Sequence, residues 1–252
     1  MISGPKGILR SSAVMASATM LSRILGLIRE QSIAMVFGAT GLTDAFWVAY
    51  RIPNMLRDLF AEGAFSSAFV PILTEEKKKG ENFSRELFWT LFVLLLVITS
   101  SLAGFICYFS GEIVGVIAPA FLEQPEVFEV TSNSVKIMAG FLPMISLAAL
   151  CMGALNTQKI FFIPACAPAT FNVILIVSIL FLSGYLNSIG VRSIYALGIG
   201  VICGGIVQFL VQVPFVLKEK YTFVFPTKFF TEPVRKIIYR LGLGTIGIAA
   251  TQ

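Results

Sequence analysis

Four arginines lie in two strongly apolar segments near the start of the chain: Arg23, Arg29, Arg51 and Arg57. An arginine at the centre of a bilayer costs about 2.5–3.5 kcal/mol on insertion scales, so these side chains are expected to face protein or a water-filled cavity rather than lipid. A guanidinium group binds phosphate or carboxylate through two parallel hydrogen bonds. The four arginines therefore predict an anion site, for which a phosphate-bearing head group is the best candidate.

The arginines have to be brought together by the two segments that carry them. We expect two membrane-spanning helices, Ile8–Phe37 and Leu42–Leu73, joined by a short turn at "GATG". Helices joined in this way run antiparallel, which puts Arg23 and Arg57 at similar depth and Arg29 and Arg51 nearer the outer side. The sequence thus predicts that the four side chains converge on one patch, with a bend near Pro53 opening a cavity.

An alternative interpretation is internal neutralisation, because buried charges are normally paired. The expected pairs are Arg23 with Glu30, Arg51 with Asp44 or Asp58, and Arg57 with Glu62. Pairing alone does not explain why so many costly groups are kept together, so we favour a functional site. The predicted substrate-binding residues are Arg23, Arg29, Arg57, Arg51, Asp44, Asn54 and Glu62.

The overall composition is that of a membrane protein. Apolar residues make up 56% of the 252 positions and charged residues 13%, against roughly 25% in soluble domains. Besides the two arginine-bearing segments, four uncharged runs are long enough to span a bilayer: Leu87–Gly111, Ile137–Gln158, Ile160–Val191 and Ser193–Leu217. A further span begins near Pro233. The predicted fold class is all-α, a polytopic transmembrane bundle with one six-helix lobe (1–217), a cytoplasmic linker (218–232) and the start of a seventh helix (233–252).

The distribution of Lys and Arg predicts the orientation. With the N-terminus in the cytoplasm, thirteen bases fall in inside segments and one, Arg192, falls outside. The outer connection "GEIVGVIAPAFLEQPEVFEV" carries four glutamates and no base. This is the positive-inside pattern, so the net charge of +5 indicates membrane topology rather than nucleic-acid binding. A contact of the basic run "EEKKKG" with anionic membrane lipids would add nothing specific.

The sequence offers little for catalysis. The chain has no histidine, the usual acid–base catalyst at neutral pH, and its four cysteines lie in apolar runs without C-x-x-C spacing. We read the cysteines as small buried apolar side chains. No nucleophile–base set or metal motif is apparent, so we expect a transporter rather than an enzyme, and no cofactor.

The stretch "SRILGLIREQSIAMVFGATGLTDAFWVAYRIPNMLRDLFAEGAFSSAFVPIL" resembles the signature of the MurJ (MviN) family of lipid II flippases, in the multidrug/oligosaccharidyl-lipid/polysaccharide exporter superfamily. "APAF" and "GALNTQKIFFIPACAPATFNV" are similar to further family motifs. The resemblance implies that Arg23, Arg29 and Arg57 hold the diphosphate and head group of lipid II. It matches Asp44 and Glu62 to the acids of the family's "TDAF" and "AEGAFS", and implies a multi-pass protein of the bacterial cytoplasmic (inner) membrane.

Two departures qualify this resemblance. Asp58 stands where many relatives have a second base, whereas Arg51 matches a position that is often basic. Family members have about fourteen helices in two lobes, so the chain resembles an N-terminal half, and alternating access implies a missing C-terminal lobe. The alternatives are a flippase for another polyprenyl-diphosphate-linked oligosaccharide, a drug exporter of the same superfamily, or a non-transporting membrane scaffold.

Overall fold

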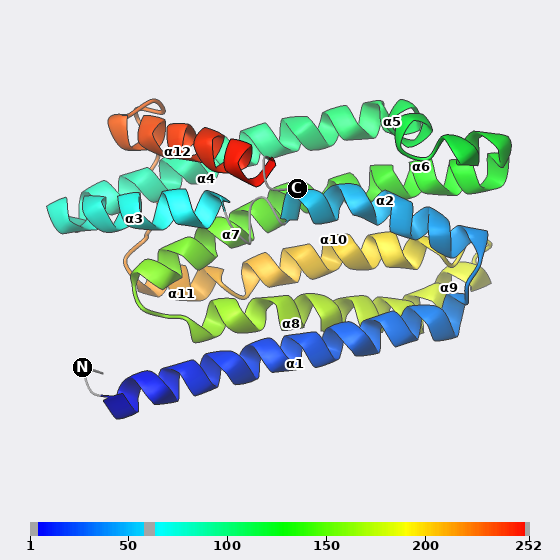
Figure 1. Ribbon diagram of the computed structural model, residues 1–252, viewed down its shortest axis with the longest axis horizontal. Helices are drawn as coiled ribbons and strands as arrows, with labels where there is room; N and C mark the ends of the chain where they lie inside the picture. Colours follow the sequence, from blue (N-terminus) through cyan, green and yellow to red (C-terminus); the bar gives the residue numbers. More distant parts are fainter. Residues whose placement is uncertain (1–4, 58–63, 250–252) are drawn as a thin grey trace.

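The predicted all-α class is confirmed. The structure, a computed structural model, describes residues 5–57 and 64–249, with side chains described over 15–55 and 65–241. All regular structure in these ranges is helical (Figure 1). The first helices are α1 (Pro5–Phe37), α2 (Gly41–Arg57), α3 (Ala64–Lys79), α4 (Glu81–Tyr108), α5 (Ser110–Ile117) and η2 (Pro119–Glu123). They are followed by α6 (Pro125–Ala139), α7 (Phe141–Thr157), α8 (Phe162–Val177), η3 (Ser178–Leu182), α9 (Ser183–Ser188), α10 (Tyr195–Leu210), α11 (Val213–Lys218) and α12 (Glu232–Ala249).

Four helical stretches are long and apolar enough to cross a membrane: Glu81–Tyr108, Pro125–Thr157, Phe162–Ser188 and Tyr195–Lys218. They coincide with the four uncharged runs of the sequence. The stretch that ends in α7 is 78% buried over its most apolar window, against 33–39% for the other three. A helix that is apolar all round is a buried helix, and α7 accordingly forms the centre of the bundle.

The break between the first two helices lies at the predicted "GATG". Gly38 ends α1 with φ +66°, the left-handed conformation that glycine adopts without strain. Thr40 begins α2, because its Oγ1 accepts a hydrogen bond from the Thr43 N–H and its carbonyl accepts from the Asp44 N–H. The Thr43 hydroxyl donates back to the Gly38 carbonyl at 2.9 Å. The turn is thus specified locally.

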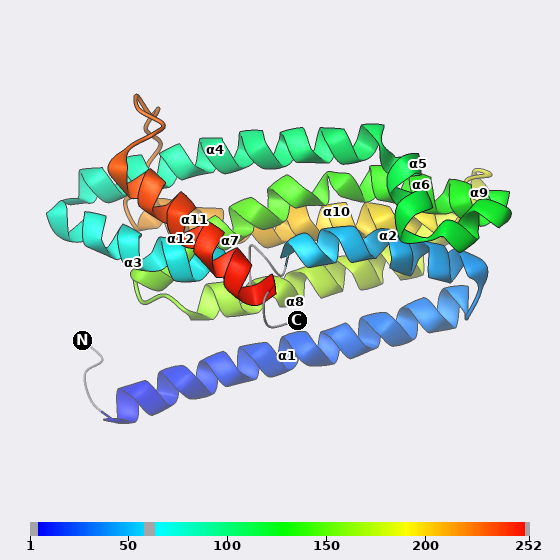
Figure 2. The same cartoon turned by 45° about the horizontal axis from the view of Figure 1, so that its top comes forward.

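The expected packing of α1 against α2 is wrong. α1 lies along α8 and η3, whereas α2 lies along α6 and α7, so the two helices diverge from their shared turn (Figures 1 and 2). The reason is that each helix buries its apolar or small residues against a different partner. Phe46, Ala49 and Tyr50 of α2 belong to a core cluster with Val130 of α6. The small residues of α1, described below, face α8.

The remaining helices pack closely around α7. Gly200 and Gly204 let α10 approach α8 and η3, since a Cβ at these positions would lie 2.5 Å from Leu175 Cδ1 and 2.7 Å from Phe171 Cδ2. A second core cluster, which includes Phe69 of α3, Phe88 of α4 and Leu150 of α7, lies beside the first. Close approach through glycine is typical of membrane helices, which gain stability from packing rather than from leaving water.

The segment between α11 and α12 is attached to α4 by a cluster that we call the linker clasp. Its residues are Lys220, Tyr221 and Thr222, which contact Glu81 and Trp89 of α4. Tyr221 is buried, and the indole Nε1 of Trp89 donates to the carbonyls of Tyr221 (3.2 Å) and Thr222 (2.9 Å). Lys220 forms an ion pair with Glu81 at 2.7 Å. These contacts fix the chain where it leaves α11.

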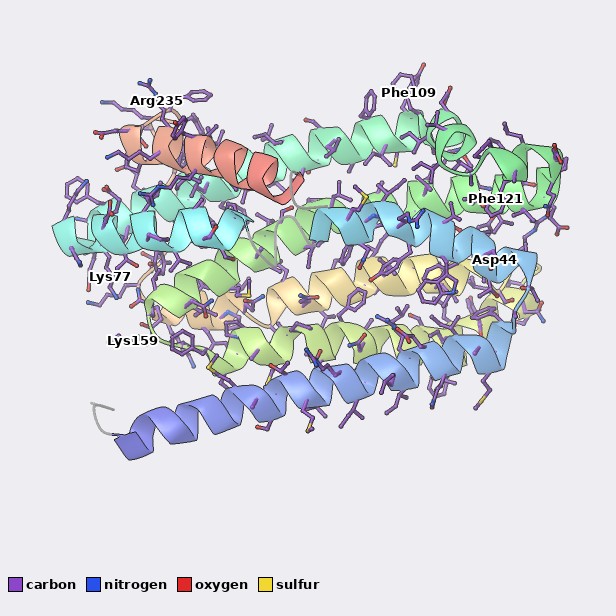
Figure 3. All side chains as sticks on the ribbon, viewed as in Figure 1. Asp44, Lys77, Phe109, Phe121, Lys159 and Arg235 are labelled. Carbon is purple, nitrogen blue, oxygen red and sulfur yellow. The ribbon has the colours of Figure 1, made fainter. Side chains whose placement is uncertain are left out.

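The two ends of the bundle differ in charge. Figure 3 places Lys77, Lys159 and Arg235 at one end, and Asp44 and Phe121 at the other. The orientation of these two ends relative to a membrane stays a prediction of the positive-inside pattern.

Candidate functional site

A cavity of about 700 Å³ opens between α1, α7, α8 and α10. Its wall is mainly apolar and includes Phe141, Met152 and Phe171. The polar residues that line it are Thr19, Ser22, Arg23, Arg29, Asn156, Asn172, Gln208 and Gln212. A mainly apolar cavity with a few polar groups is the usual form of a ligand site.

Small residues of α1 let it lie against α8 beside this cavity. Ala18, Ser22 and Gly26 recur every four residues and so share one face of the helix. Ala18 is buried, and a Cβ on Gly26 would lie 3.8 Å from Asn172 Nδ2. Arg29 and the buried Ile33 continue the same face, which brings a guanidinium group to the junction of the two helices.

Arg29 is held by a residue of α8 far away in the sequence. Its Nη1 donates to Asn172 Oδ1 at 3.1 Å, and its Nη2 forms an ion pair with Glu30 Oε1 at 3.1 Å. Asn172 also donates through Nδ2 to the Ser22 carbonyl at 3.1 Å. One carboxamide therefore fixes the helices to each other and the guanidinium to both. The Arg29 Nε is buried without a hydrogen-bond partner, which leaves a donor for a ligand or water.

Arg23 lines the same cavity but is exposed. Among the described residues it has neither a hydrogen bond nor an ion pair, so its five donors are available. The expected Arg23–Glu30 pair is wrong, because Glu30 pairs with Arg29. The reason is helical geometry: adjacent long side chains of Arg29 and Glu30 can reach each other at the helix surface, whereas residues seven apart lie two turns apart.

The predicted residues of α2 are placed elsewhere. Arg51 is exposed and Asn54 is half-buried, and neither lines the cavity. Asp44 is exposed in the first turn of α2, where a carboxylate interacts favourably with the helix dipole. Within residues 15–55, Arg51 and Asp44 form no ion pair with each other.

The remaining predicted groups fall partly or wholly outside the described structure. The backbone of Arg57 ends α2, but its side chain lies outside the described residues, as do Asp58 and Glu62. The structure thus brings together two of the four arginines, Arg23 and Arg29, and leaves Arg51 apart from them.

Sequence reasoning missed the amides of the cavity as site residues. Asn172, Gln208 and Gln212 are each at most 9% exposed. The available signal was a carboxamide within an apolar run, since a buried polar group requires a hydrogen-bond partner. That signal marks the residue without identifying the partner.

The fold and the cavity define a multi-pass membrane protein with a mainly apolar cavity between its helices, which Arg23 and Arg29 help to line. The family model described as "Lipid II flippase MurJ" matches residues 33–252. The chain belongs to the MurJ family.

Relatives and one solved structure extend this match. The chain is 38% identical over 241 residues to a "Probable lipid II flippase MurJ" of Buchnera aphidicola, which covers 93% of this chain and 45% of the relative. It is 41% identical over 214 residues to the "Lipid II flippase MurJ" of Burkholderia cenocepacia, covering 81% and 39% of the two chains. A structure titled "Lipid II flippase MurJ, inward closed conformation" superposes with a TM-score of 0.73 at 27% identity, over 93% of this chain and 48% of that one. The chain therefore spans about half the length of the relatives it matches.

Proposed function

We propose that this chain is the amino-terminal lobe of a flippase that moves lipid II, the lipid-linked peptidoglycan precursor, across the cytoplasmic membrane. The observation that carries the proposal is the pair of guanidinium groups at one cavity: Arg23 without a partner among the described residues, and Arg29 oriented by Asn172. Each phosphate of a diphosphate offers pairs of oxygens that a guanidinium fork can bind with two parallel hydrogen bonds. The choice of lipid II as the substrate follows the names of the relatives, which are described as lipid II flippases.

In this proposal the two arginines have different tasks. Arg29 is held by Asn172 and Glu30, so it offers a fixed donor and loses little conformational entropy on binding. Arg23 is exposed and free to follow the head group as it enters. Arg57 and Glu62, which the resemblance adds to the site, join from the end of α2 and the segment that follows it. Arg51 and Asp44 do not line the cavity and have no contact with the head group in this proposal.

Translocation in this proposal needs alternating access between two lobes. The exposed apolar residues of α1, among them Met20, Leu27 and Met35, would face lipid or the second lobe. The chain on its own accordingly corresponds to the binding half of the transporter, in a multi-pass arrangement with a cytoplasmic N-terminus.

Binding of lipid II to the chain in lipid nanodiscs tests this proposal. Arg23→Ala and Arg29→Ala are each expected to weaken binding by about tenfold or more, because a charge-assisted hydrogen bond contributes about 1.5–3 kcal/mol. Arg→Lys at either position should restore binding only in part, since an ammonium group cannot bind two oxygens with a planar fork. Quantitative native mass spectrometry measures the bound fraction.

Arg192→Ala is the matched control, because it removes one positive charge at the outer end, where Arg192 pairs with Glu126. It should leave binding unchanged. Arg51→Ala distinguishes the sequence-based site, which includes Arg51, from the cavity, whose described lining does not. Binding of lipid II that is equal in Arg23→Ala, Arg29→Ala and Arg192→Ala would contradict the proposal.

A further inference from the structure

Two glutamines line the cavity at the C-terminal end of α10: Gln208 in its last turn and Gln212 just beyond it; we call them the amide pair. Gln208 is 9% exposed and Gln212 only 1%. Placing a carboxamide in such an environment costs free energy unless its donors and acceptor are all satisfied. The hydrogen-bond partners of each donor and acceptor of the amide pair therefore indicate whether that atom has a structural role or is left for a ligand.

The donors of Gln212 have a structural explanation. α10 ends at Leu210, shortly before Pro214, so the regular pattern of helical backbone hydrogen bonds is interrupted there. The backbone N–H of Gln212 donates to Phe209 instead of Gln208. Its side-chain Nε2 then donates to the freed Gln208 carbonyl (3.1 Å) and to the Ala148 carbonyl of α7 (3.2 Å). The two N–H donors thus stabilise the kink.

The acceptor of Gln212 has no such explanation. Its Oε1 is buried and has no hydrogen-bond partner. The side chain of Gln208 likewise forms no hydrogen bond within the described part of the chain. Because both residues line the cavity, a donor that reaches Gln212 Oε1 has to enter from it. An amide oxygen accepts hydrogen bonds, so this group suits a hydroxyl or amide N–H and not a phosphate oxygen.

The amide pair lies at a suitable distance from the arginines. A Cβ on Gly205 would touch the ring of Phe141, which itself packs against Phe171 beside Asn172. Gln208 follows Gly205 by three residues and Gln212 by seven, or about 5 Å and about 10 Å along the axis at 1.5 Å per residue. Gln208 is thus about one helical turn, and Gln212 about two turns, from the level of Phe141 and Phe171.

We infer that the amide pair binds the sugar portion of the lipid-linked head group, with Gln212 Oε1 accepting a hydrogen bond from a sugar hydroxyl or N-acetyl N–H. The inference rests on the proposed function, in which Arg23 and Arg29 bind the adjoining diphosphate. Two parts of the cavity then bind two parts of the head group: the guanidinium groups bind the diphosphate, and the carboxamides bind the hydroxyl or N–H donors of the adjoining sugar.

The test compares two ligands on the chain in nanodiscs: lipid II, and undecaprenyl diphosphate, which has the same lipid and diphosphate but no sugar. Wild-type protein is expected to bind lipid II more tightly. Gln212→Met, which keeps an unbranched side chain of similar length, should weaken lipid II binding by about tenfold, the upper range for one hydrogen bond. The same variant should bind undecaprenyl diphosphate as wild type does. Gln31→Met, on an exposed position of α1 away from the cavity, is the matched control and should change neither affinity.

The outcomes separate the inference from the proposed function. Equal weakening of both ligands by Gln212→Met means that the residue only stabilises the kink, and unchanged lipid II binding means that it makes no contact; either overturns the inference alone. If wild-type protein binds neither ligand, the proposed function fails and the inference fails with it. A second measurement needs no variant: lipid II with O-methylated and N-methylated sugars should bind wild type no more tightly than undecaprenyl diphosphate. Full affinity for that analogue would also overturn the inference.

Discussion

Replacement of Asn172 by leucine removes the contact that joins α1 to α8 and orients Arg29. The residue makes two hydrogen bonds of 3.1 Å to α1, one from a charged guanidinium and one to a backbone carbonyl. The first is expected to contribute about 1.5–3 kcal/mol. The second, between helices in a membrane, contributes about 0.6 kcal/mol on average. Asn172→Leu should therefore lower the free energy of unfolding by about 2–4 kcal/mol.

Two further variants isolate the cause. Asn172→Asp keeps the acceptor for Arg29, adds an opposite charge and loses only the donor to Ser22, so its loss should be below about 1 kcal/mol. Asn133→Leu is the matched control, because it removes a single neutral hydrogen bond to the Tyr195 hydroxyl at 3.2 Å. Equilibrium unfolding in mixed detergent micelles measures all three. The reasoning is refuted if Asn172→Leu destabilises no more than Asn133→Leu, or if Asn172→Asp is as damaging as Asn172→Leu.

Other features lead to shorter predictions. Gly204→Ala should destabilise the protein by about 1–3 kcal/mol, because the added methyl group overlaps Phe171. Gly184→Ala is the control, because nothing lies within 4 Å of its Cβ position. Equal melting temperatures of the two variants would show that α10 does not need the close approach. In a cysteine-free background, cysteines at Gln124 and Lys78 should react with an impermeant reagent from opposite sides of intact cells, with Gln124 outside; reaction from the same side contradicts the predicted orientation. Expression of this chain alone should not restore growth of cells depleted of their own flippase, because alternating access in the proposed mechanism needs two lobes. Growth would indicate that copies of this chain assemble into a working transporter.

Local features of the sequence predicted much of the fold. Uncharged runs of sufficient length identified four spans, because the bilayer thickness sets how many apolar residues a helix needs. The turn at Gly38 was predictable for a similar reason: a glycine and two threonines contain the groups that end one helix and begin the next. Each of these signals is complete within a few residues.

The partners of the spans were less predictable. The expectation that α1 packs on α2 followed from their adjacency in the chain, whereas the small face of α1 selects α8, and Asn172 lies 143 residues from Arg29. Small residues at four-residue spacing indicate that some helix approaches closely, but they do not identify it. The arginines were expected to face protein or a cavity, and two of them, Arg23 and Arg29, line one. The predicted convergence of all four arginines assumed that α1 packs on α2. Because α1 packs on α8 instead, Arg51 lies apart from Arg23 and Arg29.

The linker clasp has a consequence for spectroscopy. The chain contains only two tryptophans, Trp47 and Trp89. The indole N–H of Trp89 is bound to the backbone of Tyr221 and Thr222, and its ring lies 4.9 Å from that of Phe223. Indole emission shifts to longer wavelength as the ring is hydrated. In a Trp47→Phe background, the intrinsic fluorescence of the protein would therefore report, without any attached dye, whether the segment leading into α12 stays bound to α4 or detaches from it.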